Sequence, residues 1–417
     1  MERVLSLFIL ALAVIIMPVD FAGADENSGV LSLEEVLQEV IERNPEISAA
    51  RASSTIAKER SPQARALDDP IFGITRWEFP ANFNILKANE TWYTLSQSFP
   101  FFGKRTTRGR VADLESDAAE EASRAVRLRM IAQAKQAYYD LFLAHQVLQI
   151  YHDQVNLARR ISQAAEERFA VGGAGQSDLI RARVELITLS NAILTLEQER
   201  ESAAARLNAL LNRPTNAPLG IPQTPVLPRF EANPETLQSE AEEARPENRM
   251  KALAVQLGQE RVTLSKQDAL PDFMAEVGFM DMHDQDHNAW MASVRINLPW
   301  FNKKKYDARI RENEAERSRA KAAHQAAVND TRLKIKELWV RFEAAKRLVR
   351  LYEEGIRPLA EQTLEAALIG YQTRKNDFLT LLDAQRNLKE LELTYFRSLA
   401  EANKHLAELE QIVGREF

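Results

Sequence analysis

Two long segments of the chain repeat their apolar side chains every seven residues. The first, Lys104 to Phe169, has no proline and a single glycine, so it predicts one helix of about 66 residues, roughly 100 Å long. The repeating positions are Leu141, Ala144, Leu148, Tyr151, Val155, Ala158, Ala165 and Phe169, followed in the second segment by Leu179, Ala182, Leu186, Leu189, Ile193, Leu196, Ala203, Leu207 and Leu210. Such a repeat is typical of left-handed coiled coils. This pattern alone fits a purely structural rod as well.

Four shorter segments alternate apolar and polar residues, as strands do. They are "DDPIFGITRWEF" (68–79), which is the least regular, "TWYTLSQSF" (91–99), "DFMAEVGFMDM" (272–282) and "NAWMASVRINL" (288–298). Strands of about ten residues with one apolar and one polar face are typical of transmembrane barrels. A soluble sandwich also uses such strands, but no other segment would supply its second sheet.

Similar segments recur in the same order roughly 200 residues apart. The junction "FPFFGKR" is matched by "LPWFNKK", which places Pro100 and Pro299 199 residues apart. Phe169 is likewise matched by Tyr371, at a spacing of 202. The motif "RNPE", with Pro45, is matched by "ARPE", with Pro246. We therefore predict a tandem duplication in which each copy contains a short helix, two strands and two long helices.

The N-terminus has the pattern of a secretory signal peptide. Arg3 precedes an apolar run from Val4 to Val19, and small residues lead to a cleavage site after Ala24. A membrane anchor is the alternative, although about 16 apolar residues are few for a spanning helix. The predicted organisation is a signal peptide (1–24), a first repeat (25–213), a stiff connector with six of the sixteen prolines (214–234) and a second repeat (235–417).

The composition excludes several classes of protein. Without cysteine the chain has no disulfide framework, no thiolate metal site and no acylation at an N-terminal cysteine. A net charge of -6, with both signs interspersed, argues against nucleic acid as a partner. No nucleophile elbow, glycine-rich phosphate loop or HExxH motif occurs, so we predict neither an enzyme nor a bound cofactor.

The four strands require further copies of the chain if they lie in a membrane. The smallest closed barrels have about eight strands. An open edge in lipid leaves backbone groups unpaired, which costs several kcal/mol each. We therefore expect an oligomer in which each subunit contributes two hairpins. No run of about 20 apolar residues follows the predicted signal, so insertion into the membrane would be by strands.

The two matching junctions connect a strand to a long helix. Prolines end strands because they cannot donate to the ladder, and aromatic rings suit the membrane interface. The basic residues that follow are disfavoured by the helix dipole, so we suggest that lipid phosphates bind them. A solvated basic turn is the alternative. The residues assigned to this membrane-interface junction are Phe99, Pro100, Phe101, Phe102, Lys104, Pro299, Trp300, Phe301 and Lys303.

With these features the sequence resembles the TolC family of outer-membrane efflux proteins over essentially its whole mature length. The resemblance is most specific in the duplication, the junctions and the segments "ERFAVGGAGQSDLIRARVEL" and "GYQTRKNDFLTLLDAQRNL". It implies a homotrimer with a 12-stranded β-barrel in the outer membrane and an α-helical barrel in the periplasm. The connector would then be equatorial, and the partners would be a periplasmic adaptor, an inner-membrane pump of RND type and outer-membrane lipid.

The resemblance implies a passive exit duct of a tripartite efflux system, and "FPFFGK" is similar to the heavy-metal branch, which favours metal cations as cargo. The alternative is a periplasmic coiled-coil adaptor or structural protein without a barrel. By the same resemblance, Asp178, Arg181 and Asp383 are candidates for a periplasmic gate, although local capping or pairing would explain them too. Thr380 stands where relatives often have an acidic residue, so a double acidic ring is in doubt.

The predicted hairpin tips resemble the adaptor-docking surfaces of the family. Their residues are Val171, Gly172, Gly173, Gly175, Arg374, Lys375, Asn376 and Asp377. Plain helix turns would also favour glycine there. In the loop "MHDQDH", between the last two strands, His283, Asp284, Asp286 and His287 are weak candidates for a transient metal site, and a solvated polar loop is the stronger interpretation.

Overall fold

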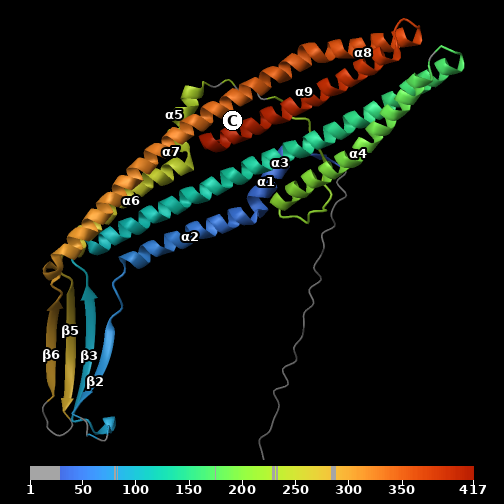
Figure 1. Ribbon diagram of the computed structural model, residues 1–417. Helices are drawn as coiled ribbons and strands as arrows, with labels where there is room; N and C mark the ends of the chain where they lie inside the picture. The colour runs from blue at the N-terminus through green and yellow to red at the C-terminus, as the bar shows by residue number, and fades with distance from the viewer. Residues whose placement is uncertain are drawn as a thin grey trace, which may run out of the picture.

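The computed structural model of the chain describes residues 29–78, 81, 83–173, 175–227, 231, 233–282 and 288–417. A long body of helices has a four-stranded sheet projecting from one end and two helical hairpins at the other (Figure 1). No helix in these residues is long and apolar enough to cross a membrane. The predicted signal peptide, residues 1–24, lies outside the described residues.

The elements follow one another twice in the same order. The first repeat contains α1 (Leu33–Arg43), α2 (Pro45–Arg65), β2 (Ile71–Trp77), η1 (Ile85–Lys87), β3 (Glu90–Phe99), α3 (Lys104–Ala170) and α4 (Gln176–Leu210). The second contains α5 (Pro234–Ala244), α6 (Pro246–Asp268), β5 (Phe273–Met282), β6 (Ala289–Ile296), η2 (Pro299–Asn302), α7 (Lys303–Leu351), η3 (Tyr352–Ile356), α8 (Arg357–Gln372) and α9 (Phe378–Val413). The predicted fold class, mainly helical with a four-stranded antiparallel sheet and a tandem duplication, is confirmed.

The helix starts have clear local causes. Ser32 accepts a hydrogen bond from the Glu35 amide and forms a capping box at α1. Asn44 caps α2, and Pro45 at the first helical position has no amide hydrogen to leave unpaired. The corresponding helix of the second repeat, α6, also begins with a proline, Pro246.

The long helices of the two repeats differ in continuity. The helix α3 runs unbroken for 67 residues, as its sequence predicts. Its counterpart is interrupted between α7 and α8 by a five-residue π-helical turn, Tyr352–Ile356. Pro358 follows this turn at the start of α8 and lacks the amide hydrogen that a continuous helix would need.

The four strands form one antiparallel sheet in the order β2-β3-β5-β6. The middle contact, β3 with β5, joins the two repeats, so β2 and β6 are the outer strands. The register places apolar residues from all four strands on one face: Phe72, Ile74, Tyr93, Leu95, Val277, Phe279, Trp290 and Val294. The other face carries polar residues, among them Glu276 and Arg295, which form an ion pair.

The predicted heptad positions supply part of the interior of the helical body. Those that are buried are Leu141, Leu148, Val155, Ala158, Ala165, Ala182, Leu189, Ala203 and Leu207. Phe169, in the last turn of α3, is instead 44 % exposed. A buried ion pair between Lys135 Nζ and Glu410 Oε2, at 2.5 Å, links α3 to α9 and so joins the two repeats.

A short parallel ladder that the sequence pattern did not predict ties the connector to the N-terminal segment. Here β1 (Val30–Leu31) pairs with β4 (Ile221–Pro222). The Tyr138 hydroxyl donates to the Leu31 carbonyl at 3.0 Å and lies 3.3 Å from the Gln223 carbonyl. Burial raises the pKa of Tyr138, so the phenol stays neutral and holds the connector against α3. The extended connector is therefore anchored to the helical body.

Candidate functional site

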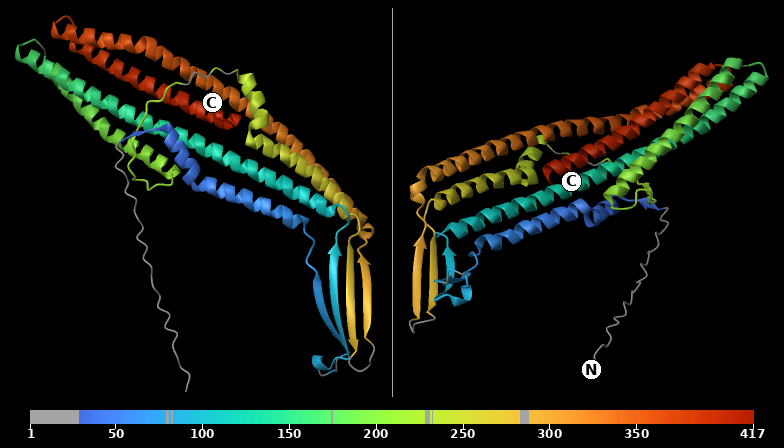
Figure 2. Two further views of the ribbon diagram at one scale, coloured as in Figure 1. Left: turned by 180° about the vertical axis from the view of Figure 1, so that it is seen from behind. Right: turned by 60° about the horizontal axis from the view of Figure 1, so that its bottom comes forward.

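The end of the body opposite the sheet consists of two hairpin tips, α3–α4 and α8–α9, which lie side by side in every view (Figure 1, Figure 2). Arg168, in the last turn of α3, connects them. Its guanidinium donates to the Tyr371 carbonyl at 2.8 Å and to the Gly173 carbonyl at 2.7 Å. It also lies 4.3 Å from the centroid of the Tyr371 ring. Arg168 therefore ties the first-repeat tip to the second-repeat tip.

The two tips have the same turn, built from different residues. The Gly173 amide donates to the Arg168 carbonyl at 2.7 Å, and the Lys375 amide donates to the Gly370 carbonyl at 2.8 Å. Each turn has one residue in the left-handed region: Gly172, with φ of 70°, and Arg374, with φ of 63°. Glycine adopts this conformation without strain, whereas arginine does not.

The predicted tip residue Asp377 caps the N-terminus of α9. Its carboxylate accepts hydrogen bonds from the Thr380 amide at 2.9 Å and from the Thr380 hydroxyl at 2.6 Å. Both bonds lower the pKa of Asp377 below its usual value, and the bond from the hydroxyl contributes more than the bond from the amide. Thr380, where the family resemblance suggested an acidic residue, thus completes a helix cap.

Of the three gate candidates, Asp178 and Arg181 lie one turn apart on α4, and Asp383 lies on α9. Asp178 is half-buried on α4, and its negative charge adds to the burial that raises the pKa of Tyr371. Arg181 and Asp383 are exposed. Among the described residues none of the three forms an ion pair within the chain. Any ring of carboxylates would have to be formed between copies.

The structure adds a contact near Asp383 that sequence analysis missed. Arg386, one turn along α9, reaches Glu185 on α4 at 2.5 Å. This hydrogen bond raises the pKa of Arg386, and the charge of Asp383 contributes less. Arg168 was missed as well, although it stands in the segment that carries the family resemblance and Tyr371 in the one that matches it. Only the approach of the two hairpins brings these residues together.

At the sheet end, the first junction contains a buried lysine. Lys104 is only 2 % exposed, and its ammonium donates to Asp272 Oδ1 at 2.7 Å and to the Leu270 carbonyl at 3.1 Å. The Phe101 amide donates to the same Asp272 oxygen at 2.8 Å. Lys104 therefore does not face lipid phosphates as predicted. Its ammonium pairs with Asp272 of the same chain, and this carboxylate offsets the cost of burying the charge.

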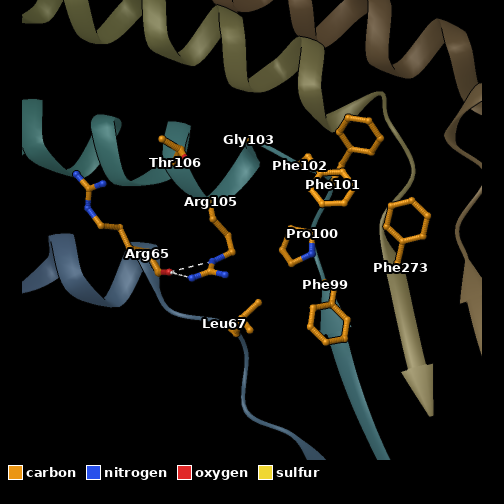
Figure 3. A pocket seen from close by; sticks show the side chains of 10 residues that line it. All are labelled: Arg65, Leu67, Phe99, Pro100, Phe101, Phe102, Gly103, Arg105, Thr106 and Phe273. Carbon is orange, nitrogen blue, oxygen red and sulfur yellow. Dashed lines mark hydrogen bonds between the residues drawn. The ribbon is translucent and has the colours of Figure 1, made fainter.

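A cavity of about 630 Å³ opens beside this junction (Figure 3). Its lining residues are Arg65, Leu67, Phe99, Pro100, Phe101, Phe102, Gly103, Arg105, Thr106 and Phe273. Arg105 donates twice to the Arg65 carbonyl, at 2.7 and 3.0 Å, and so holds α2 against the start of α3. The Phe102 ring is 84 % exposed at the outer surface.

The second junction is more open. Pro299 is buried, whereas Trp300, Phe301 and Lys303 are exposed. Lys303 has no ion pair or side-chain hydrogen bond with any described residue. The prediction that Lys303 and the aromatic rings meet the membrane interface stays a prediction.

The structure offers no resident metal site in the part of the chain that it describes. Those residues contain no group of three or more His, Asp or Glu side chains able to hold an ion. The weak candidates His283, Asp284, Asp286 and His287 lie outside the described residues.

Comparisons with known proteins agree with this architecture. The chain is 24 % identical to the cobalt-zinc-cadmium resistance protein CzcC of Cupriavidus metallidurans, over 94 % of this chain and 91 % of that protein. Its fold matches the outer membrane protein VceC of Vibrio cholerae with a TM-score of 0.77 at 17 % identity, covering 92 % of this chain and 96 % of that one. It matches CusC with a TM-score of 0.76 at 16 % identity, covering 92 % of each chain.

The family assignment rests on the sequence. The model of the family described as "Outer membrane efflux protein" matches residues 36–213 and 237–415, one segment in each repeat. These segments include both hairpin tips and both strand-to-helix junctions. The chain belongs to the outer membrane efflux protein family.

Proposed function

We propose that this efflux channel is the passive exit duct of a tripartite system, with its sheet in the outer membrane and its helices in the periplasm. The observation that carries the proposal is the apolar face of the sheet. It projects away from the helical body (Figure 1), and Trp290 and Val294 on it are 77 % and 72 % exposed. So large an apolar surface needs an apolar environment, and lipid supplies one.

The proposal includes a homotrimer. The outer strands β2 and β6 present unpaired edges, which are costly in lipid. Three copies would provide twelve strands, with β6 of one copy beside β2 of the next. The helical bodies of the three copies would continue the conduit into the periplasm, and the proposed cleaved signal peptide, without lipidation, would direct export of the chain.

The tips are the proposed contact with a periplasmic adaptor, which would link the duct to an inner-membrane pump of RND type. The exposed tip residues include Val171, Gly172, Arg374 and Lys375. Asp178, Arg181 and Asp383 are proposed to line the gate in the trimer. Arg168 would restrain the gate, because separating the two hairpins breaks its bonds to Tyr371.

Divalent metal cations are the proposed cargo. Two observations favour them: the similarity to a cobalt-zinc-cadmium resistance protein over most of the chain, and the "FPFFGK" junction. The duct itself would carry out no catalytic step. Asp383, repeated around a threefold axis, would concentrate cations at the tip.

Fractionation and mass measurement test the proposal first. The mature chain is expected in the outer membrane, and its detergent-extracted form should have the mass of three protomers. A deletion strain should become sensitive to Co²⁺, Zn²⁺ or Cd²⁺, and the intact gene should restore growth. A periplasmic species of one or two chains would contradict the duct and favour the alternative of a coiled-coil adaptor.

Full resistance of the deletion strain, together with a trimer in the outer membrane of the strain that carries the gene, would contradict only the metal cargo. An Asp383→Asn variant tests the gate, since it removes the charge with little change in size. Its cation selectivity in planar bilayers should fall, whereas removal of the half-buried Asp307 carboxylate near the sheet, as the matched control, should leave selectivity unchanged.

A further inference from the structure

Inside one chain the two repeats are joined at the sheet by a compact polar arrangement, here called the clasp. It consists of Lys104, the carboxylate of Asp272, the Leu270 carbonyl and the Phe101 amide. Lys104 follows β3, and Asp272 immediately precedes β5, the neighbouring strand. The clasp therefore joins the strand-to-helix junction of the first repeat to the start of the β5–β6 hairpin in the second repeat.

The duplication supplies a second lysine for such a clasp. Lys303 follows Pro299 by four residues, as Lys104 follows Pro100. Each lysine is the first residue of a long helix, α7 or α3. Trp300 takes the place of Phe101, whose amide donates in the clasp.

The ladder register identifies a second acceptor. Continued by four residues beyond the pair Ile71 and Ser96, the β2–β3 register places Leu67 opposite Pro100. Figure 3 shows Leu67 near Pro100, as this register requires. Two residues further along the chain is Asp69.

The second hairpin repeats this arrangement. Continued by three residues beyond the pair Phe273 and Ile296, the β5–β6 register places Leu270 opposite Pro299. Leu67 thus corresponds to Leu270, and Asp69 corresponds to Asp272. The motif Leu-x-Asp occurs once before each hairpin, and each copy of the chain has one Lys-and-Asp set in use and one spare.

The spare residues lie at opposite edges of the sheet. Asp69 precedes β2 and Lys303 follows β6 (Figure 1). Both side chains are exposed, and neither forms an ion pair or side-chain hydrogen bond with a described residue. One edge thus presents a spare cation and the other a spare anion, at equivalent positions of the duplicated fold.

We propose that a second copy of this chain completes the clasp. Lys303 of one copy binds the Asp69 carboxylate and the Leu67 carbonyl of the next, and the Trp300 amide donates to the same carboxylate. The inference deepens the proposed function, because it rests on edge-to-edge assembly of copies. It also assigns Lys303 a protein partner instead of lipid phosphate.

Charge exchange on the full chain tests this pairing. The variants are Lys303→Asp, Asp69→Lys and the double exchange, and the matched control is Lys304→Asp, which makes the same charge change at the next, also exposed, position. Each is extracted from the outer membrane in mild detergent. The mass of the oligomer and the temperature at which it dissociates are then measured.

Each single exchange should lower the dissociation temperature by about 5 °C or more, since like charges would meet at every boundary between copies. The double exchange should recover most of this loss, and Lys304→Asp should change little. Equal losses for Lys303→Asp and Lys304→Asp would overturn the proposal. So would a double exchange no more stable than the worse single variant.

Metal export measured in the same strains separates this inference from the proposed function. If the double exchange restores the oligomer but the wild-type chain exports no metal, the pairing stands and the cargo proposal fails. If export is normal and Lys303→Asp dissociates like the wild type, the duct stands and the pairing is wrong.

Discussion

Lys104 and Lys303 occupy the same position in the two repeats, yet their surroundings in the chain are opposite. Lys104 is buried against Asp272, whereas Lys303 is exposed and follows β6, an outer strand of the sheet. The local sequences, "FPFFGK" and "LPWFNK", are alike, so the difference comes from the neighbour. Lys104 lies beside a hairpin of the same chain, and Lys303 lies at an open edge. Equivalent sequences therefore do not guarantee equivalent environments.

The two tips teach the converse. There the same turn is built from unlike residues: Gly172 matches Arg374, and Gly175 matches Asp377. The hydrogen-bonded path of the backbone is kept while side chains diverge. The left-handed residue is glycine in the first tip and arginine in the second. The helix that follows the turn has a side-chain cap only in the second tip, where Asp377 provides it. The duplication thus provides a matched control for each position.

The largest effect is expected from breaking the clasp. Lys104→Ala leaves the Asp272 carboxylate without its cation, which should lower the free energy of unfolding by about 3 kcal/mol. Thermal denaturation followed by circular dichroism measures this loss. The matched control, Lys304→Ala at an exposed site, should cost less than about 0.5 kcal/mol. Equal midpoints for the two variants would contradict the structural role of Lys104.

A smaller, local effect is expected at the tips. Arg168→Ala removes the hydrogen bond and the ring contact to Tyr371 that join the hairpins, and also the bond to Gly173 within the first tip. Amide hydrogen exchange near the end of α8 and the start of α9 should become roughly tenfold faster, because local opening becomes easier. Arg181→Ala, at an exposed arginine of the same hairpin, is the control. Unchanged exchange in Arg168→Ala would show that the tie contributes nothing.

Exchanging the left-handed residues sharpens the comparison of the two turns. Gly172→Ala should destabilise its turn by about 1 kcal/mol, purely through backbone strain, since the added methyl group would meet no atom within 4 Å. Arg374→Gly should relieve strain in the other turn. Exchange rates of the turn amides would move in opposite directions for the two variants. A parallel change would argue against strain as the cause.

The smallest effect concerns the helix caps. Gly175→Asp should give α4 the cap that Asp377 gives α9, slowing exchange in its first turn by less than about twofold. The pKa of Asp377 is lowered in the folded chain, so its carboxylate stabilises the fold above the ordinary pKa of 3.8. That contribution is lost as the pH falls through the lower folded value. The gain in Gly175→Asp should disappear in the same acidic range.

Much of the fold could be predicted from the sequence because its signals are local. The long stretch without proline predicted α3, observed as Lys104–Ala170, and alternation predicted the regular strands to within a few residues. The π-helical break at Tyr352–Ile356 and the β1–β4 ladder were not predicted. The break lies inside a segment whose residues otherwise favour a continuous helix, just before Pro358. The ladder joins two segments that are almost two hundred residues apart and have no periodicity of their own.

The candidate site was less predictable. The tip segments were located correctly as hairpin turns, but Arg168 and Arg386 act across hairpins and have no pattern in the sequence. Lys104 was assigned to lipid because its helix position disfavours a cation. Asp272, which compensates for this, lies 168 residues away in the chain.

By itself the sequence determined the duplication, the coiled-coil helices, the amphipathic strands and the junctions between them, because periodicity and proline act within a few residues. The tertiary structure alone decided which lysine is buried, which arginine ties the tips and which strand edges stay open. Those outcomes depend on distant segments approaching within hydrogen-bonding distance, where burial makes an unpaired charge costly. The same rule, applied to two similar junctions, leaves one lysine paired in the chain and the other available to a second copy.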